Sequence, residues 1–326
     1  MDEIELAAEA ISGSGSLALA CHMLPDGDAL GSMLALHHLC RAQGKLSVAS
    51  WPEPFVVGPH YTYLPGLDLV TKPVDFPSAP EVMVTFDCGS LGRLGELAAS
   101  AEAADRLVVV DHHATNDRYG SVNLVDPDAA SSCELVYQLI RRMGGVPNTE
   151  EATALYTGIV TDTGRFQYSS TSPATLRVAA DLRERGVDHT LVSNEIFESA
   201  PFGYLHTLGI VLSRARLEDG LVWSWLELKD LNGTRLDEAE DMINQLRSVR
   251  EAGVAVLLKE TEPGHYKVSM RSRGNVDVAQ IAAAFGGGGH ARAAGFPAPG
   301  GVEETIAAIR SALAPAGAGP PERAGA

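Results

Sequence analysis

The feature that most constrains this chain is a series of short, unbroken apolar runs in its first half, each ending in polar or turn residues. The runs are SLALACHM, KLSVASW, EVMVTFD and RLVVVD. An apolar run without alternation suits a strand that is buried on both faces. Helix-like segments separate the runs, and alternating strands and helices form parallel sheets. The first half is therefore predicted to be an α/β domain, a parallel sheet with helices on both faces.

The helical segments are identified by the spacing of their apolar residues and by their ends. DALGSMLALHHLCRAQG ends at a glycine, as helices often do, and LGRLGELAAS is a shorter candidate. Three further helices are predicted from SSCELVYQLIRRMGG, TEEATALYTGIVTDTG and SPATLRVAADLRERG.

The pattern changes from about Gly203 onwards. LVWSWLEL, VAVLLKE and HYKVSMRS predict a small sheet with a hairpin at TEPG, and LDEAEDMINQLRSV, DVAQIAAAF and GVEETIAAIRSAL predict helices. We therefore expect a first domain over 1–190, a helical connector over 191–212 and a smaller α/β domain over 213–314. Residues 315–326, rich in Pro, Gly and Ala, are predicted to be a disordered tail.

Acidic and imidazole side chains follow the ends of the predicted strands, where open parallel sheets bind their ligands. They are His22, Asp26, Asp28, Asp87, Asp111, His112 and His113, with Asp162 at the end of a later helix or turn. Turn or helix-cap roles explain several of these residues singly. Two adjacent histidines behind an aspartate have no such structural explanation.

Four carboxylates gathered at one edge would repel one another and destabilise the fold unless cations were bound. Two divalent ions would remove this repulsion, and mixed oxygen and imidazole ligands suit Mn²⁺ better than Mg²⁺. A pair of metal ions about 3.5–4 Å apart is a standard arrangement for cleaving phosphate esters, because a bridging water becomes hydroxide near neutral pH. The pattern predicts a phosphoesterase with two Mn²⁺ ions.

The charge of the chain limits its partners. The 326 residues carry a formal net charge of −17, which opposes binding of long nucleic acid. We expect a small phosphate substrate and no long duplex. The chain contains no apolar run long enough for a membrane span. It opens with MDEIELAAEAISGSG, unlike a signal peptide, and its four cysteines are scattered without a CxxC motif. A cytoplasmic protein is predicted.

The motifs resemble a known family. HMLPDGDALGS, VTFDCG, VVVDHH and TDTGRF resemble the four N-terminal motifs of the DHH phosphoesterases, and RSRGNVDVAQIAAAFGGGGHARAAG resembles the hallmark of their associated C-terminal domain. The resemblance runs from about residue 10 to 315 and is nearest to stand-alone two-domain oligoribonucleases. It implies an active-site cleft between the domains. It also implies hydrolysis of short oligoribonucleotides and of 3′-phosphoadenosine 5′-phosphate by hydroxide attack at two Mn²⁺ ions.

The same resemblance implies a role for each residue. His22, Asp26 and Asp87 would hold one Mn²⁺, and Asp28, Asp87, His112 and Asp162 would hold the other. Asp87 would then bridge the ions. Asp111 would accept a hydrogen bond that orients an imidazole. His113 would contact the scissile phosphate as an electrophile or proton donor.

The second domain is interpreted as a substrate-binding domain. Its candidate substrate contacts are Arg271, Arg273, Gly287, Gly288, Gly289 and His290. Glycines allow backbone N–H groups to approach a phosphate closely. Four glycines precede His290, and the Ala-rich stretch after them is interpreted as a helix. Arg271 is expected to bind a terminal phosphate or a base.

Several alternatives stay open at this point. A phosphodiesterase acting on cyclic or linear dinucleotides, such as cyclic di-AMP or pApA, would use the same chemistry. An inorganic pyrophosphatase would share the first-domain motifs, but the GGGGH stretch disfavours it. A non-catalytic nucleotide sensor would be expected to have lost metal ligands, and none is lost here. A processive RecJ-type exonuclease would need further domains and a more basic surface. A homodimer is left open.

Overall fold

The computed structural model describes residues 2–236, 238–274 and 276–313. The chain divides into two compact units, Met1–Ser199 and Ala200–Ala326. The division falls within the predicted connector, 191–212, and the predicted tail, 315–326, lies outside the described residues. Among the described residues, no helix is both long enough and apolar enough to span a membrane.

The first unit is built on a five-stranded parallel sheet with the order β2-β1-β3-β4-β5. The strands are β1 (Ser16–Cys21), β2 (Leu46–Ser50), β3 (Val82–Phe86), β4 (Arg106–Asp111) and β5 (Val122–Val125). The four apolar runs of the sequence form the first four strands. The short edge strand β5 was not predicted, because only its last two residues are buried.

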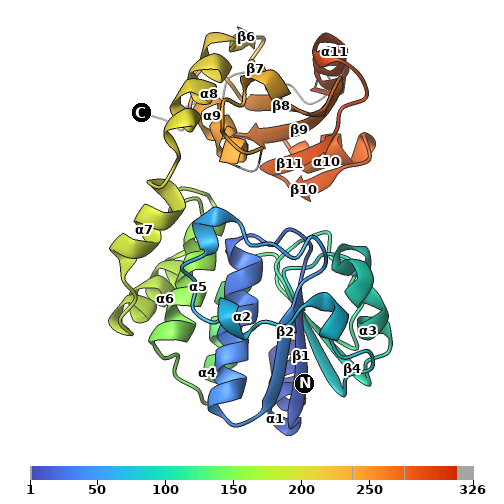
Figure 1. Cartoon of the computed structure of the whole chain (residues 1–326), viewed down its shortest axis with the longest axis vertical. Helices are drawn as coiled ribbons and strands as arrows, with labels where there is room; N and C mark the ends of the chain where they lie inside the picture. The colour runs from blue at the N-terminus through green and yellow to red at the C-terminus, as the bar shows by residue number, and fades with distance from the viewer. Residues whose placement is uncertain (1, 237, 275, 314–326) are drawn as a thin grey trace. The chain divides into compact units, whose positions relative to one another are not determined.

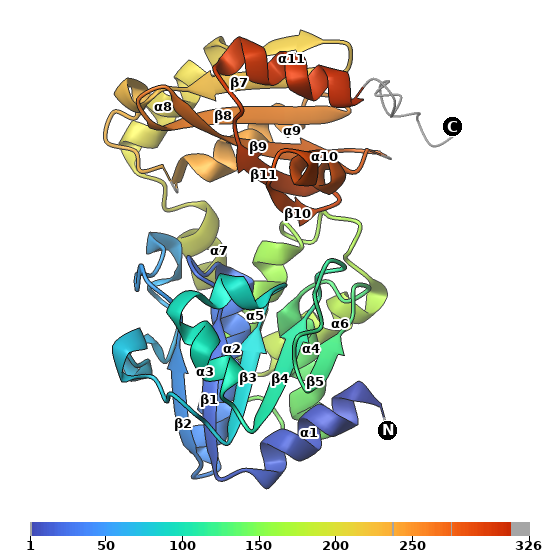
Figure 2. The same cartoon turned by 90° about the vertical axis from the view of Figure 1, so that its right-hand side faces the viewer.

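Helices cover both faces of this sheet, as predicted (Figures 1 and 2). One face packs against α1 (Glu3–Gly13), α2 (Gly27–Ala42), α4 (Ser132–Arg142) and α5 (Thr149–Asp162), with α6 (Pro173–Glu184) and α7 (His189–Phe197) beside α5. The other face packs against η4 (Leu91–Leu97) and α3 (Ala98–Glu102). The predicted helix LGRLGELAAS is wrong as a single element: Gly95, with φ 51° and ψ −130°, interrupts it.

Two glycines allow α2 and α5 to pack closely. A Cβ atom on Gly31 would lie 2.3 Å from the carbonyl oxygen of Ala154, and one on Gly158 would lie 2.8 Å from Asp28 Oδ1. Real Cβ atoms do not approach other atoms so closely. The close approach brings the first turn of α2, with Asp28, against α5, which ends at Asp162.

The second unit contains a six-stranded sheet with the order β10-β11-β9-β8-β7-β6. Its strands are β6 (Arg216–Glu218), β7 (Leu221–Leu226), β8 (Val254–Glu262), β9 (His265–Ser272), β10 (Gly288–His290) and β11 (Ala293–Pro297). Its helices are α8 (Phe202–Ser213), α9 (Ile243–Arg247), α10 (Val278–Ala284) and α11 (Val302–Leu313). One face of the sheet packs against α10 and α11, and the other against α8 and α9.

Two predictions for this unit need correction. The Ala-rich stretch after the four glycines is not a helix but leads into the strand β11, which pairs with β10. Gly287 and Gly289 permit this pairing, since a Cβ atom on them would lie 2.1 Å and 2.4 Å from carbonyl oxygens of β11. The long helix expected from LDEAEDMINQLRSV is only a 3₁₀ turn, η6 (Glu238–Met242), followed by α9. The β8–β9 hairpin at TEPG is present as predicted.

The remaining elements of the described residues are short 3₁₀ turns. They are η1 (Pro59–Tyr61), η2 (Leu67–Leu69), η3 (Pro73–Asp75) and η5 (Leu228–Asp230).

Candidate metal centre

The acidic and imidazole residues singled out in the first half of the sequence gather at the carboxyl ends of the parallel strands. His22 directly follows β1, Asp87 directly follows β3, and Asp111 is the last residue of β4, followed by His112 and His113. Helix ends supply the remaining three. Asp26 caps α2, accepting from the N–H groups of Asp28 and Ala29, Asp28 lies in the first turn, and Asp162 is the last residue of α5.

The side chains form three overlapping groups. Within each group the potential ligand atoms all lie within 4.8 Å of one another. The groups are His22, Asp26 and Asp87; Asp28, His112 and Asp162; and Asp87, His112 and His113. Asp87 and His112 each belong to two groups. The three groups therefore form one continuous cluster of potential metal ligands.

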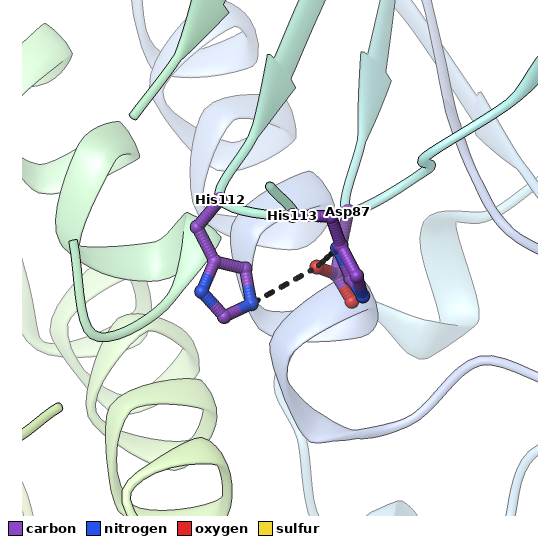
Figure 3. A group of neighbouring side chains, drawn as sticks. All are labelled: Asp87, His112 and His113. Atoms are coloured by element: carbon purple, nitrogen blue, oxygen red, sulfur yellow. Dashed lines mark ion pairs between the residues drawn. The ribbon is translucent and has the colours of Figure 1, made fainter. Parts of the chain in front are cut away.

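Asp87 belongs to two of the three groups, and Figure 3 shows it beside His112 and His113. Its Oδ2 lies 3.4 Å from His22 Nε2, whereas its Oδ1 lies 3.6 Å from His112 Nε2 and 3.5 Å from His113 Nδ1. The two oxygens therefore face different imidazoles. The backbone of Asp87 has a φ of 51°, which is rare for a residue other than glycine. Its N–H donates to the carbonyl of Val110 (3.0 Å), which supports this conformation.

The adjacent histidines point to different partners. His112 Nε2 lies 3.2 Å from Asp162 Oδ2 and 3.9 Å from Asp28 Oδ2, and its Nδ1 lies 3.3 Å from the carbonyl oxygen of Ala129. His113 Nδ1 lies 2.7 Å from Asp111 Oδ1. The imidazole that Asp111 orients is thus that of His113, while a backbone carbonyl orients His112.

Asp111 is fixed in turn by its own neighbours. Its Oδ1 also accepts from the backbone N–H groups of His112 (2.8 Å) and His113 (3.3 Å), and its Oδ2 accepts from the side-chain amide of Asn116. Asn116 was not predicted from the sequence. Its only local signal is the turn-like ATN that follows the histidines.

The first turn of α4 supplies contacts that were also missed. The N–H of Ser132 donates to Asp28 Oδ2 (2.6 Å) and that of Cys133 donates to Asp28 Oδ1 (2.8 Å). The Ser132 hydroxyl donates to Asp87 Oδ1 (3.1 Å). The N–H groups of a first helical turn lack partners within the helix and favour an anionic acceptor. The predicted start of the SSCELV helix was the available signal.

Burial and neighbouring charges shift the pKa values of the carboxylates at this edge. Burial, followed by the charge of Asp87, raises the pKa of Asp28 to about 7. Burial opposes ionisation of Asp87 too, but the hydrogen bond with His22 and the charges of His113 and His112 hold its pKa well below the usual range. Divalent cations would neutralise the same carboxylates, and the oxygen and nitrogen donors present fit them.

The three histidines at this edge also have shifted pKa values. Burial by itself would lower the pKa of His22, His112 and His113, but the carboxylates that face them raise it in all three.

The candidate substrate contacts of the second half lie in and beside its sheet. Arg271 is in β9, Arg273 follows the end of β9, Gly287 precedes β10, and Gly288 and Gly289 lie in β10. The backbone of His290 ends β10, and its side chain lies outside the described part of the structure. Gly288 pairs with Gly295 of β11, which pairs with Ser269 of β9. Because paired residues share a face and side chains alternate, Gly288 lies on the same face as Arg271.

Comparison with known proteins agrees with this architecture. Residues 16–159 match the DHH family, N-terminal domain, and residues 227–314 match the DHHA1 domain. The chain is 33% identical to the bifunctional oligoribonuclease and PAP phosphatase NrnA of Thermus thermophilus, over 97% of this chain and 96% of that protein. It is 29% identical to the protein of the same name from Bacillus subtilis, over 87% of this chain and 90% of the relative.

A solved structure shows the same fold. The crystal structure of an exopolyphosphatase-related protein from Bacteroides fragilis superposes with a TM-score of 0.88 at 25% identity, covering 95% of each chain. The chain therefore belongs to the DHH family, carries a DHHA1 domain in its second unit, and is a hydrolytic phosphoesterase.

Proposed function

We propose that this enzyme is a Mn²⁺-dependent phosphoesterase that hydrolyses short oligoribonucleotides and 3′-phosphoadenosine 5′-phosphate. The observation that carries the proposal is the placement of the Asp87 carboxylate. Its two oxygens face two different groups of potential ligand atoms. The substrate class is supported by the relatives, which are named for oligoribonuclease and PAP phosphatase activities and match nearly the whole chain. We also propose that the activity is cytoplasmic.

The side chains present fit two divalent cations. We assign His22, Asp26 and Asp87 to one cation, and Asp28, His112 and Asp162 to the other, each a group of neighbouring ligand atoms. Asp87 would be shared, because its Oδ1 lies 3.6 Å from His112 Nε2. The mixture of imidazole nitrogen and carboxylate oxygen favours Mn²⁺ over Mg²⁺. When bound, two such cations would acidify a water molecule and withdraw negative charge from the scissile phosphate.

His113 is proposed to act on the substrate. Its Nδ1 lies 2.7 Å from Asp111 Oδ1, and we assign the contact with a phosphate oxygen to its Nε2. The facing carboxylates of Asp111 and Asp87 outweigh the effect of burial and raise the pKa of His113. In this role a protonated ring would hold one proton toward Asp111 and offer the other to the phosphate or the leaving oxygen.

We assign substrate capture to Arg271, Arg273, the glycines of the β10 segment and His290. A protein with a net charge of −17 needs local positive groups to attract a phosphate. Arg271 and Gly288 lie on the same face of the second sheet, and Gly288 is exposed. Two anchoring groups suit a short substrate with a phosphate and a base.

A substrate panel tests the proposal. The purified protein is stripped with EDTA and assayed with Mn²⁺ or Mg²⁺ against a diribonucleotide, 3′-phosphoadenosine 5′-phosphate, a cyclic dinucleotide, pyrophosphate and a long RNA. The expected result is hydrolysis of the first two, restored better by Mn²⁺ than by Mg²⁺. Full activity in excess EDTA would contradict the metal mechanism. Preference for the cyclic dinucleotide or for pyrophosphate would replace the proposed substrate class.

A further inference from the structure

We propose that Ser132 is a positioning residue that fixes the rotation of the Asp87 carboxylate, so that each of its oxygens faces a different cation. The inference rests on the proposed two-cation site. It assigns a role in that site to a residue that is neither a metal ligand nor a substrate contact.

Ser132 contacts two of the proposed ligands at once. Its hydroxyl donates to Asp87 Oδ1 (3.1 Å), and its N–H donates to Asp28 Oδ2 (2.6 Å). All three residues are almost completely buried, with exposed fractions of 0% for Ser132 and Asp28 and 2% for Asp87. Water therefore cannot easily replace the hydroxyl, and Ser132 ties the shared carboxylate to a ligand of one cation only.

The rotation of Asp87 needs such a restraint. The terminal torsion of an aspartate is broad, so nothing within the side chain itself fixes where each oxygen points. Oδ1 has two imidazole nitrogens nearby, at 3.5 Å and 3.6 Å, and Oδ2 has one at 3.4 Å. A carboxylate oxygen has two lone pairs, so Oδ1 can accept from Ser132 and still bind a cation.

The neighbouring serine provides a matched control. Ser131 caps α4, and its hydroxyl accepts from the N–H of Glu134 (3.2 Å). Ser132 is the first residue of the helix, and its hydroxyl donates to Asp87. Both side chains are fully buried. The two serines are thus adjacent and chemically identical. The hydroxyl of Ser131 caps the helix, whereas that of Ser132 contacts the candidate metal centre.

The test is Mn²⁺ binding to the full-length protein, measured by calorimetry and by electron paramagnetic resonance. Wild type is expected to bind two ions with the spectrum of a coupled pair. Ser132→Ala should still unfold cooperatively without metal, but should bind one of the two ions about 10–100-fold more weakly, the usual effect of losing a group that orients a ligand. The signal of the coupled pair should weaken accordingly. Ser132→Thr, which keeps the hydroxyl, should recover binding.

Ser131→Ala should lower the unfolding temperature through the lost helix cap while leaving Mn²⁺ affinity unchanged. Wild-type affinity and spectrum in Ser132→Ala would overturn the inference while leaving the two-cation site intact. Loss of a cooperative unfolding transition in Ser132→Ala, or equal losses of affinity in both alanine variants, would show a purely structural role. A wild-type protein that binds fewer than two ions would overturn the proposed site itself, and the inference with it.

Discussion

His112 and His113 show how two adjacent residues of the same type acquire different chemistry. The strand β4 ends at Asp111, so the two rings leave the backbone in different directions. His112 faces the carboxylates of Asp162 and Asp28, whereas His113 is held by Asp111. Their substitution should therefore have different consequences.

The first prediction compares His113→Ala with Asp87→Ala. His113→Ala should keep bound metal but lower turnover by about 10²–10⁴-fold, the usual contribution of a positioned acid or base. Asp87→Ala removes the carboxylate shared by both proposed cations and should lose metal as well as activity. Metal content after gel filtration, measured beside kcat, distinguishes the two. An empty site in His113→Ala together with a loaded one in Asp87→Ala would contradict the assignment.

The second prediction concerns pH. Asp28 has a pKa of about 7, far above its ordinary value of 3.8, so its contribution to stability is lost as pH rises toward and through 7. The three histidines have raised pKa values, so their contribution is present below 6.5 and is also lost as pH rises. The pKa of Asp87 is lowered, so its contribution to stability is lost as pH falls. This loss occurs only below the ordinary pKa of an aspartate.

The metal-free protein should therefore lose thermal stability between pH 5 and pH 8. Added Mn²⁺ should raise the unfolding temperature more at pH 8 than at pH 5, because protons no longer compete for the ligands. Thermal scans with EDTA and with Mn²⁺ at both pH values measure the difference. An equal increment at both would show that these groups do not hold the ion.

The candidate ligands could be predicted from the sequence because each follows a recognisable strand or begins or ends a helix. Their partners could not. Ser132 lies 45 residues from Asp87 and 104 from Asp28 along the chain, and its contacts involve one hydroxyl and one backbone N–H. Neither group has a sequence signature, since nearly every residue carries an N–H and serine occurs in many turns.

At the level of elements, the four glycines before His290 are not equivalent. Gly287 and Gly289 are required by the close pairing of β10 with β11, and Gly286 has a φ of 78°. Gly288 has no such requirement, because its φ is not positive and a Cβ atom there would meet nothing within 4 Å. The fold explains three of the four glycines, and a ligand that approaches the backbone would explain the other.

The third prediction follows from this difference. Gly287→Ala should cost about 1–3 kcal/mol of stability, because the new methyl group overlaps β11. Gly288→Ala should leave the free energy of unfolding within about 0.5 kcal/mol of wild type. It should nevertheless lower kcat/KM for a dinucleotide about tenfold or more, the effect of one lost hydrogen bond to a charged group. Wild-type kcat/KM in Gly288→Ala would exclude close backbone contact with substrate.

The elements that were predicted wrongly share a physical cause. The HARAAG stretch has the alanine content of a helix, but β11 pairs with both β10 and β9, and this tertiary pairing overrides local propensity. In LGRLGELAAS the apolar spacing is helical, yet Gly95 adopts a conformation outside the helical region. Buried strands were predictable because burial on both faces leaves an unbroken apolar run, which is visible without knowledge of the partners.

At the scale of the whole molecule, chemistry and substrate capture are proposed to lie in different units. All the candidate metal ligands belong to Met1–Ser199, and the candidate substrate contacts belong to Ala200–Ala326. Each unit has its own sheet and its own hydrophobic core. A substitution in the second unit can therefore be tested for effects on binding without disturbing the metal ligands.

The last prediction uses this separation. Arg271→Ala should lower kcat/KM for a dinucleotide by about 1–3 kcal/mol, the range for losing a hydrogen bond to a charged group. Hydrolysis of bis-p-nitrophenyl phosphate, which lacks the second anchoring group, should change much less. The control is Arg250→Ala, which removes the same charge from an exposed arginine of the same unit, paired only with its neighbour Glu251 among the described contacts. It should affect neither substrate, which separates local binding from net charge. Equal losses on both substrates in Arg271→Ala would mean that Arg271 serves the reaction centre or the fold, and that capture and chemistry are not divided between the units.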